Sequence, residues 1–383
     1  MKILLYDMGA YTQNDLTSCL KARGVAYRSI YYRCKDIYQD DFFCRRFEKY
    51  LCADDYACVL SINFFPLVAT ICHKHGIPYI SWSYDSPLSY KKHPYFHFPT
   101  NRIYLFDRIE CEMLEKQGFQ TVHHLPLGIN TARLDQSVPT ATDAAAYSCD
   151  VSMVGTMYQS QLPEIIAPLS AYDRGYIDAI VCSQALLYGC YMAEELITDV
   201  MLQRIRQAHE RIGQEIEIDA PELSIAIATR IAGIERRRLL EEMGGRFGLH
   251  LYSRHVDTVP QGVTYHGTVR YFDEMPKVFK LSRININPTL KSIRSGIPLR
   301  ALDILGCGGL LLSNYQHELV EYFVPGEEVV VYESIEDAGE KADFYLRHDD
   351  ERRRVAANGY RKVCERFSFD GQLARIFAEA GLG

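Results

Sequence analysis

The residues best suited to chemistry lie between Arg283 and Asn314, in the stretch RININPTLKSIRSGIPLRALDILGCGGLLLSN. This pattern predicts a strand that ends near Asn287, a polar loop, and a helix that begins at Pro298. The first amides of a helix have no intrahelical partners and carry partial positive charge, so the pattern predicts a cradle for a diphosphate. The residues expected to form this cradle are Asn287, Thr289, Ser292, Arg294, Ser295, Gly296, Ile297 and Pro298.

Two charged residues follow inside the expected helix. Asp303 would lie where its carboxylate accepts hydrogen bonds from a diol such as a ribose, and Arg300 would bind phosphate or orient Asp303. A simpler interpretation stays open, in which Ser292 to Gly296 form an ordinary helix start and Asp303 is solvated.

Other candidates follow strand-like segments. Gly155 and Thr156 come after CDVSMV, where a backbone close to a phosphate or a plain turn is possible. Arg254 is the last residue of GLHLYSR and is a candidate phosphate ligand or a solvated loop charge. No Asp-x-Asp triplet follows a strand, so we expect amides and arginines, rather than a metal ion, to neutralise the diphosphate. The twelve cysteines form no CxxC pair, which disfavours a zinc site and a disulfide scaffold.

Composition indicates an ordinary two-domain protein. The chain has 383 residues, 48% of them hydrophobic and 24% charged, and a net charge of −7. The negative charge disfavours nucleic acid as a partner. No apolar run approaches the ~20 residues of a transmembrane helix, and MKILLYD is typical of a first strand rather than a signal peptide. We therefore expect a cytoplasmic protein.

Strands and helices alternate along both halves of the chain. Residues 1–135 predict a Rossmann-like domain with a parallel sheet covered on both faces. Residues 136–148 lose this rhythm and predict a linker. Residues 149–365 predict a second Rossmann-like domain, which contains a helical segment at 159–245. Residues 366–383 are expected to form a C-terminal helix that packs back on the first domain.

Acidic strand ends in the first half are candidates for a general base. WSYDSP places Asp85 at the carboxyl end of a strand, where it either takes a proton from an acceptor hydroxyl or caps the following turn. Asp7 is the second candidate. The residues expected to line the acceptor site are Gly9, Tyr11, Asn63 and Asp107.

Much of residues 149–365 resembles the CgeB-like (spore-maturation-protein-like) glycosyltransferases, which are related to the group-one and family-four superfamily. The resemblance rests on SIRSGIPLRALDILGCGG, CDVSMVGTMY, YHGTVRYFDEMPKVFKLSRININPTL and the segment that begins at VYESIEDAGEK. The first domain resembles the group more loosely, through WSYDSP and LFDR.

The resemblance implies an α/β fold of the GT-B type: two Rossmann-like domains around a cleft, with the donor in the second domain, the acceptor mainly in the first, and no metal or other cofactor. It also implies that residues around the nucleobase are Tyr265, His266, Gly267 and Val269. A pair of donor-binding glutamates, eight positions apart in the superfamily, falls at Ser295 and Asp303. Aspartate keeps the ribose role, whereas serine removes the carboxylate expected near the sugar.

The sequence thus predicts a metal-independent glycosyltransferase that moves a hexose from a nucleoside diphosphate, with UDP favoured, to a saccharide or protein acceptor. Two alternatives stay open: a nucleotide-sugar-binding protein without turnover, and a nucleotide-sugar 2-epimerase on the same fold.

Overall fold

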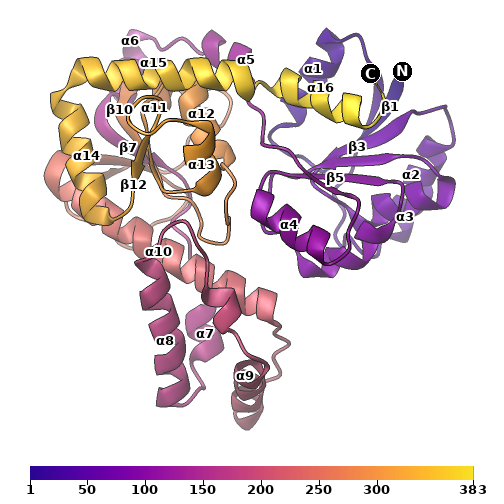
Figure 1. Cartoon of the computed structure of the whole chain (residues 1–383), viewed down its shortest axis with the longest axis horizontal. Helices are drawn as coiled ribbons and strands as arrows, with labels where there is room; N and C mark the ends of the chain where they lie inside the picture. The colour runs from indigo at the N-terminus through magenta and orange to yellow at the C-terminus, as the bar shows by residue number, and fades with distance from the viewer. Residues whose placement is uncertain (383) are drawn as a thin grey trace. The chain divides into compact units, whose positions relative to one another are not determined.

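The computed structural model describes residues 1–382, except the side chain of Tyr90, as two compact units. Unit 1 combines Met1–Asn130 with the chain from Glu365 onward, and unit 2 is Thr131–Cys364. Each unit contains one six-stranded sheet with helices packed against it (Figure 1). This is the α/β architecture expected from the alternating pattern.

The sheet of unit 1 is parallel throughout, in the order β2-β1-β3-β4-β5-β6. Its strands are β1 (Lys2–Asp7), β2 (Ala26–Tyr31), β3 (Cys58–Ile62), β4 (Tyr79–Trp82), β5 (Asn101–Leu105) and β6 (Val122–His124). Its helices are α1 (Gln13–Ala22), α2 (Asp41–Leu51), α3 (Pro66–His75), the 3-10 helix η1 (Tyr90–His97), α4 (Arg108–Lys116) and α16 (Phe369–Glu379).

Helix α16 belongs to unit 1 although it lies at the other end of the sequence. The ring of Phe369 lies 5.0 Å from that of Trp82, and Arg23 forms an ion pair with Asp370 at 2.6 Å. A Cβ on Gly128 would lie 2.8 Å from the Cα of Phe369, so this glycine permits the close approach. The C-terminal helix is therefore an integral part of the first unit.

The sheet of unit 2 is also parallel, in the order β12-β11-β10-β7-β8-β9. Its strands are β7 (Cys149–Val154), β8 (Leu249–Tyr252), β9 (Val263–Tyr265), β10 (Ser282–Asn287), β11 (Leu311–Asn314) and β12 (Val330–Tyr332). Its remaining helices are α5 (Thr131–Gln136), α6 (Ala141–Tyr147), α7 (Leu162–Ile166), α8 (Ala171–Ala185), η2 (Ala193–Leu196), α9 (Asp199–Arg211), α10 (Ala220–Phe247), α11 (Met275–Leu281), α12 (Leu299–Gly306), α13 (His317–Tyr322), α14 (Ile335–Arg347) and α15 (Asp349–Arg366).

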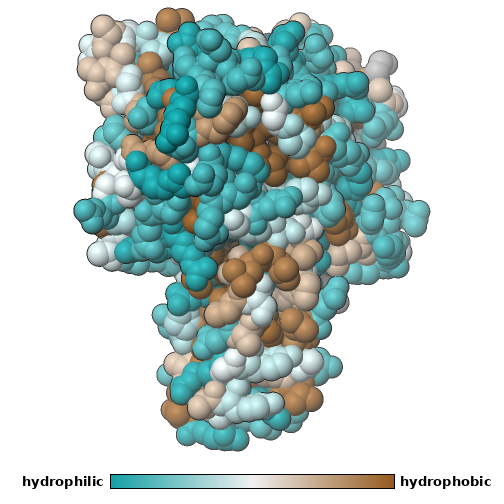
Figure 2. Space-filling view, turned by 60° about the vertical axis from the view of Figure 1, so that its left-hand side comes forward, coloured by the Kyte–Doolittle hydropathy of each residue, from teal (hydrophilic) through white to brown (hydrophobic). Residues whose placement is uncertain are grey.

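The helices from α7 to α10 form what we call the helical insertion, which lies between β7 and β8 and projects from the sheet (Figure 1). Its helices share a hydrophobic cluster of their own that includes Ile177, Ile205 and Ile227. Apolar side chains also reach its surface, as the brown areas at the bottom of Figure 2 show. Exposed examples are Tyr172, Leu186 and Val200.

The predicted linker at 136–148 differs from the structure. Residues Ala141–Tyr147 form α6, because Thr140 and Asp143 form a capping box at its start. Lys277 of α11 pairs with Asp143 at 3.0 Å, so this segment is packed within unit 2. The chain divides instead after Asn130 and after Cys364.

No helix within residues 1–382 has both the length and the apolar run required to cross a bilayer.

Candidate active site

The strand order of unit 2 defines one topological switch point. The chain proceeds outward from β7 through β8 to β9, and then from β10 in the opposite direction through β11 to β12. Neighbouring loops therefore diverge where β7 and β10 end, and open α/β sheets bind ligands at that place. These loops begin at Gly155 and Pro288.

Arg236 of α10 links the two loops at this switch point. Its guanidinium donates to the carbonyl of Thr156 and, at 2.7 Å, to the carbonyl of Pro288. It also lies 4.6 Å from the centre of the Tyr158 ring. Arg236 is 8% exposed, and burial lowers its pKa, although an arginine stays charged in any case. Both acceptors are neutral, and the charge of the neighbouring Glu235 opposes the shift that burial causes in the pKa of Arg236.

Gly155 leaves room for this arrangement. A Cβ at this position would lie 3.0 Å from Nη1 of Arg236, tighter than nearly all real Cβ contacts. Its amide donates to the carbonyl of Tyr252 at 3.0 Å, which fixes the loop to β8. The glycine thus gives room to a cation, a reason that the sequence did not indicate. Thr156, whose side chain is exposed, contributes its carbonyl.

A buried ion pair lies beside Arg236. The ammonium of Lys291 is 3.6 Å from the carboxylate of Glu235 and 3.4 Å from the centre of the Tyr188 ring, and it donates to the carbonyl of Leu187 at 3.0 Å. Burial raises the pKa of Glu235 and lowers that of Lys291, while each charge opposes the shift of the other. The pair holds the loop after β10 against the helical insertion.

Arg294 adds a second tether between this loop and the insertion, because its guanidinium pairs with Glu194 of η2. The predicted phosphate role of Arg294 therefore competes with an ion pair inside unit 2. The loop that precedes α12 is positioned by the insertion at two places, Lys291 and Arg294.

Helix α12 begins at Leu299. Pro298 occupies the N-cap position, and its side chain forms no capping hydrogen bond. Gly296 and Ile297 before it are buried, whereas Pro298 and Arg300 are partly exposed. The first amides of α12 are thus not satisfied by a capping side chain, which keeps the predicted anion-binding role open to test.

Asp303 lies in the second turn of α12 and is only 1% exposed. Its carboxylate accepts from the hydroxyl of Tyr271 at 2.9 Å and from Arg300 at 3.3 Å. Arg300 also contacts the sulfur of Met275. Burial, followed by the charge of Asp303, raises the pKa of Tyr271 far above its ordinary value, so Tyr271 stays a donor. A ribose hydroxyl would have to take the place of Tyr271.

The carboxylate of Glu318 lies beside Ser295, at the position where the resemblance led us to expect a glutamate. The hydroxyl of Ser295 donates to Glu318 of α13 at 2.8 Å, and the amide of Glu318 donates to the carbonyl of Ser295 at 3.0 Å. Both residues are almost fully buried. The loop before α12 therefore does have an acidic neighbour, supplied by a residue 23 positions later in the chain.

The polar residues at the ends of β10 and β11 hold one another. Asn287 donates to Thr289 at 3.2 Å and to Ser313 at 3.3 Å, and the amide of Thr289 donates to Asn314 at 2.6 Å. Ser292 is also buried, and its hydroxyl has no hydrogen-bond partner in residues 1–382. Asn287 and Thr289 thus shape the loop from within.

The expected nucleobase segment follows the edge strand β9. His266 stacks on Tyr252 at 4.7 Å and lies 3.2 Å from the ring nitrogen of His250. The hydroxyl of Tyr265 donates to backbone carbonyls after β8, including that of Arg254 at 3.3 Å. Gly267 has a φ of +74°, which a glycine adopts without strain. Val269 is partly exposed and Arg254 is exposed, and their roles stay predictions.

Unit 1 has its own switch point, between β1 and β3. Asp7 ends β1 and accepts from the amide of Gly9 at 2.7 Å. Asn63 follows β3 in a left-handed conformation, with φ +65°, and donates to the exposed Asp85 at 2.6 Å. Burial lowers the pKa of Lys92, and the charge of Asp85 opposes that shift. These acidic residues do gather at one end of the sheet.

Two predicted acceptor residues differ in their surroundings. Tyr11 is 68% exposed. Asp107 is fully buried and accepts from the amide of Glu110 at 3.3 Å as the N-terminal cap of α4. In this structure the carboxylate of Asp107 caps α4, and its role at the acceptor-sugar site stays a prediction.

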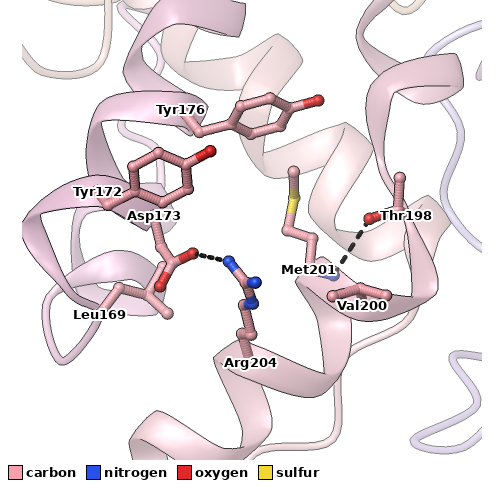
Figure 3. Close-up of a pocket in the computed structure, with 8 residues that line it drawn as sticks. All are labelled: Leu169, Tyr172, Asp173, Tyr176, Thr198, Val200, Met201 and Arg204. Carbon is pink, nitrogen blue, oxygen red and sulfur yellow. Dashed lines mark hydrogen bonds and ion pairs between the residues drawn. The ribbon is translucent and has the colours of Figure 1, made fainter.

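Three cavities lie in unit 2, and two of them are lined in part by Tyr158 or Tyr188. The largest, about 870 Å³, lies between α10 and the loops that follow β7 and β8, and includes Arg230, Arg237 and His255. A second, about 410 Å³, is next to Tyr188. A third, about 140 Å³, lies between α8 and α9, where Arg204 pairs with Asp173 at 2.6 Å (Figure 3).

Sequence reasoning missed Arg236 and Glu318. A helical pattern does contain a signal for Arg236, because it shares a face with the buried Leu239, Leu240 and Met243. No local pattern marks Glu318, since only the fold brings α13 to Ser295.

The fold is that of GT-B glycosyltransferases. Over nearly the whole chain, the structure is similar to that of the Anabaena protein HepE in complex with UDP-glucose (TM-score 0.57, 8% identity, 100% of this chain and 99% of that chain covered). It is also similar to sucrose-phosphate synthase from Thermosynechococcus elongatus (TM-score 0.55, 13% identity, 99% and 98% covered).

The sequence comparisons agree with the expected resemblance. Residues 234–378 match the family described as glycosyl transferase-like. The spore protein CgeB of Bacillus subtilis is 27% identical over 129 residues, which span 32% of this chain and 39% of that protein. The resemblance to CgeB-like glycosyltransferases is thus confirmed, and the family match lies mostly in unit 2 and ends in α16 of unit 1.

Proposed function

We propose that the chain is a glycosyltransferase that binds a nucleoside-diphosphate sugar, with UDP as the nucleotide, at the β7/β10 switch point. The observation that carries the proposal is the buried guanidinium of Arg236, which donates only to neutral backbone carbonyls. The charge of Glu235 acts on Arg236, but Glu235 also pairs with Lys291, so two buried cations share one carboxylate. Taking a charge out of water is costly unless an opposite charge is near, and a diphosphate would supply the missing negative charge. The solved complexes of HepE with UDP-glucose and UDP support the choice of nucleotide.

In the proposed site, Arg236 and the amides at the start of α12 attract the diphosphate, with Arg300 available at the same helix. These cations would act in place of a metal ion. Asp303 would hold the ribose after exchanging the Tyr271 hydroxyl, and Glu318 would supply the acidic group behind Ser295. The acceptor, a saccharide or a protein, would give its proton to Asp85 or, as the second candidate, Asp7. The twelve cysteines, all free, support a reducing cytoplasmic compartment.

A nucleotide screen tests the proposal. Thermal unfolding would be measured with UDP, GDP, ADP and their glucose conjugates, in the presence of EDTA. At a concentration 100 times Kd a ligand stabilises the folded state by about 2.7 kcal/mol, and UDP is expected to give the largest shift. Absence of any shift with all nucleotides would overturn the proposed site.

Product analysis separates the proposal from its alternatives. Release of UDP and free or transferred glucose from UDP-glucose, without added metal, supports a glycosyltransferase. Binding without release indicates a nucleotide-sugar-binding protein, and a sugar epimerised at C2, tested with UDP-N-acetylglucosamine, indicates an epimerase.

A further inference from the structure

A cysteine, a histidine and a glutamate lie in line on the surface of unit 1, away from the strand ends described above. The sulfur of Cys52 is 3.8 Å from Nδ1 of His75, and Nε2 of His75 is 2.6 Å from a carboxylate oxygen of Glu48. Cys52 is exposed, whereas His75 and Glu48 are 26% and 32% exposed at their side chains. The thiol is therefore accessible, and the hydrogen bond between His75 and Glu48 fixes the other two groups.

The three groups are brought together by two helices. Glu48 lies in α2, one turn before Cys52, which ends that helix, so both face the same side. His75 is the last residue of α3, and Gly76 after it adopts φ +65° to end the helix. Lys74 donates to the same carboxylate oxygen at 2.7 Å. Hydrogen bonds from Lys74 and His75 lower the pKa of Glu48, so the carboxylate is ionised at neutral pH.

This arrangement determines the role of each ring nitrogen. The ionised Glu48 accepts a hydrogen bond from Nε2–H of His75, and in that tautomer of the ring the lone pair is on Nδ1, toward the sulfur. A nucleophile, a base within reach and a group that orients the base is the combination that activates thiols. Cys52 stands at the C-terminal end of α2, where the helix dipole disfavours an anion, so the base must remove the proton as the sulfur reacts.

We propose that Cys52, His75 and Glu48 form a thiol-modification site at which Cys52 exchanges with low-molecular-weight disulfides. His75 takes the thiol proton while the sulfur of Cys52 attacks one sulfur of the disulfide RS–SR. The S–S bond breaks, a Cys52–S–S–R bond forms, and the leaving thiolate takes the proton from His75 as RSH. Cys52 is oxidised and the leaving sulfur is reduced, so no further oxidant is needed.

The site is independent of the proposed transferase function. Helices α2 and α3 connect parallel strands and therefore run against them, so their C-terminal ends lie at the amino ends of the strands. Asp7 and Asn63 lie at the carboxyl ends. Modification of Cys52 is thus expected to leave the residues at the β1/β3 switch point unblocked.

The test compares two exposed cysteines in one molecule. The full chain would be treated with oxidised glutathione at pH 7 with EDTA, and the modification of each cysteine followed by peptide mass spectrometry. Cys182, exposed on α8 and without a histidine partner in the described chain, is the internal control. Ordinary cysteine is only a few per cent thiolate at pH 7, so base assistance can raise the rate by about 10-fold or more. Cys52 is expected to react about 10-fold faster than Cys182.

Variants separate base assistance from simple exposure. His75→Gln should bring Cys52 to within about 3-fold of Cys182, Glu48→Gln should give an intermediate rate, and neither should change Cys182. The fully buried Cys58 and Cys72 should stay unmodified, which verifies folding in the same spectra. Equal rates at Cys52 and Cys182 in the unmodified chain, or an unchanged rate in a folded His75→Gln variant, would overturn the proposal.

Discussion

The two switch points present different side chains at the same end of a parallel sheet. In unit 1 the ends of β1 and β3 carry Asp7 and Asn63, with the exposed Asp85 bonded to Asn63. In unit 2 the ends of β7 and β10 enclose the buried guanidinium of Arg236. Parallel sheets present strand ends in the same way whatever their sequence, so the side chains that arrive there decide the chemistry.

Burial strengthens the attraction between Arg236 and an anion. A cation fixed in a poorly solvated place attracts an anion more strongly than one in water, and it needs no reorganisation when the anion arrives. An exposed carboxylate keeps its solvent and can exchange protons with a bound hydroxyl. The comparison supports the proposal that the diphosphate binds in unit 2 and that a carboxylate of unit 1 takes the proton, and four changes test it.

Replacing Asp85 by Asn should have the largest effect. If Asp85 is the general base, Asp85→Asn lowers the transfer rate by about 10²- to 10⁴-fold, because the amide accepts no proton. The amide still reaches Asn63, so the fold and the affinity for UDP should be unchanged. Steady-state transfer and UDP binding would be measured together. A larger loss of transfer rate in Asp7→Asn than in Asp85→Asn would indicate that Asp7 is the base.

Removing the charge of Arg236 should affect binding and stability together. Arg236→Met leaves the carbonyls of Thr156 and Pro288 without their donor, which should cost about 3 kcal/mol of unfolding free energy. UDP affinity should fall by about 100-fold, since the diphosphate loses a desolvated cation. Urea unfolding and calorimetric titration would check both.

Two controls sharpen the Arg236 result. Arg236→Lys keeps the charge but not the planar fork that spans two carbonyls, so it should lie between the wild type and Arg236→Met. Arg238→Met, on the exposed side of α10, should change neither quantity. Unchanged UDP binding in Arg236→Met would contradict the donor site.

Asp303 gives a smaller and more selective test. If ribose replaces Tyr271 at its carboxylate, Tyr271→Phe should keep or tighten UDP binding, because the competing hydroxyl is gone. Asp303→Asn should weaken UDP by about 10-fold, as one charged hydrogen bond becomes neutral. UDP and inorganic diphosphate would be titrated in parallel, and only UDP should respond. An equal loss for both ligands would mean that Asp303 does not contact ribose.

Most elements of both sheets were predictable from the sequence, whereas part of the site was not. Short apolar runs such as KILLYD and GLLLSN mark strands because a sheet covered on both faces is buried throughout. Residues 136–148 were misinterpreted as a linker. Small and polar residues also form a helix where a capping box begins it and a neighbouring helix packs against it.

Contacts between residues distant in sequence limited how much of the site could be predicted. Ser295 and Asp303 could be proposed from the spacing, but Glu318 reaches Ser295 only through the fold, and Tyr271 reaches Asp303 over 32 positions. Asp107 had the composition and position of a site residue, and the structure uses it as a helix cap.

The smallest expected effect is the loss of stability on protonation of buried histidines in the two units. Burial lowers the pKa of His93 and His123 in unit 1 and of His250 and His266 in unit 2, and the charge of His266 further lowers that of His250. A group with a lowered folded-state pKa contributes stability above its unfolded value, about 6.5, and that stability is lost as pH falls through this value toward the folded pKa. The protein should therefore be less stable at pH 5 than at pH 7.

Because ring nitrogens of His250 and His266 lie 3.2 Å apart, the two rings cannot both be protonated without mutual repulsion, so this pair should account for part of the loss. His266→Phe keeps a ring stacked on Tyr252 and removes one site of protonation. Its urea midpoint should fall less between pH 7 and pH 5 than that of the wild type. The exposed His255→Gln should behave as the wild type does. An equally steep fall in His266→Phe would place the acid-sensitive groups in unit 1.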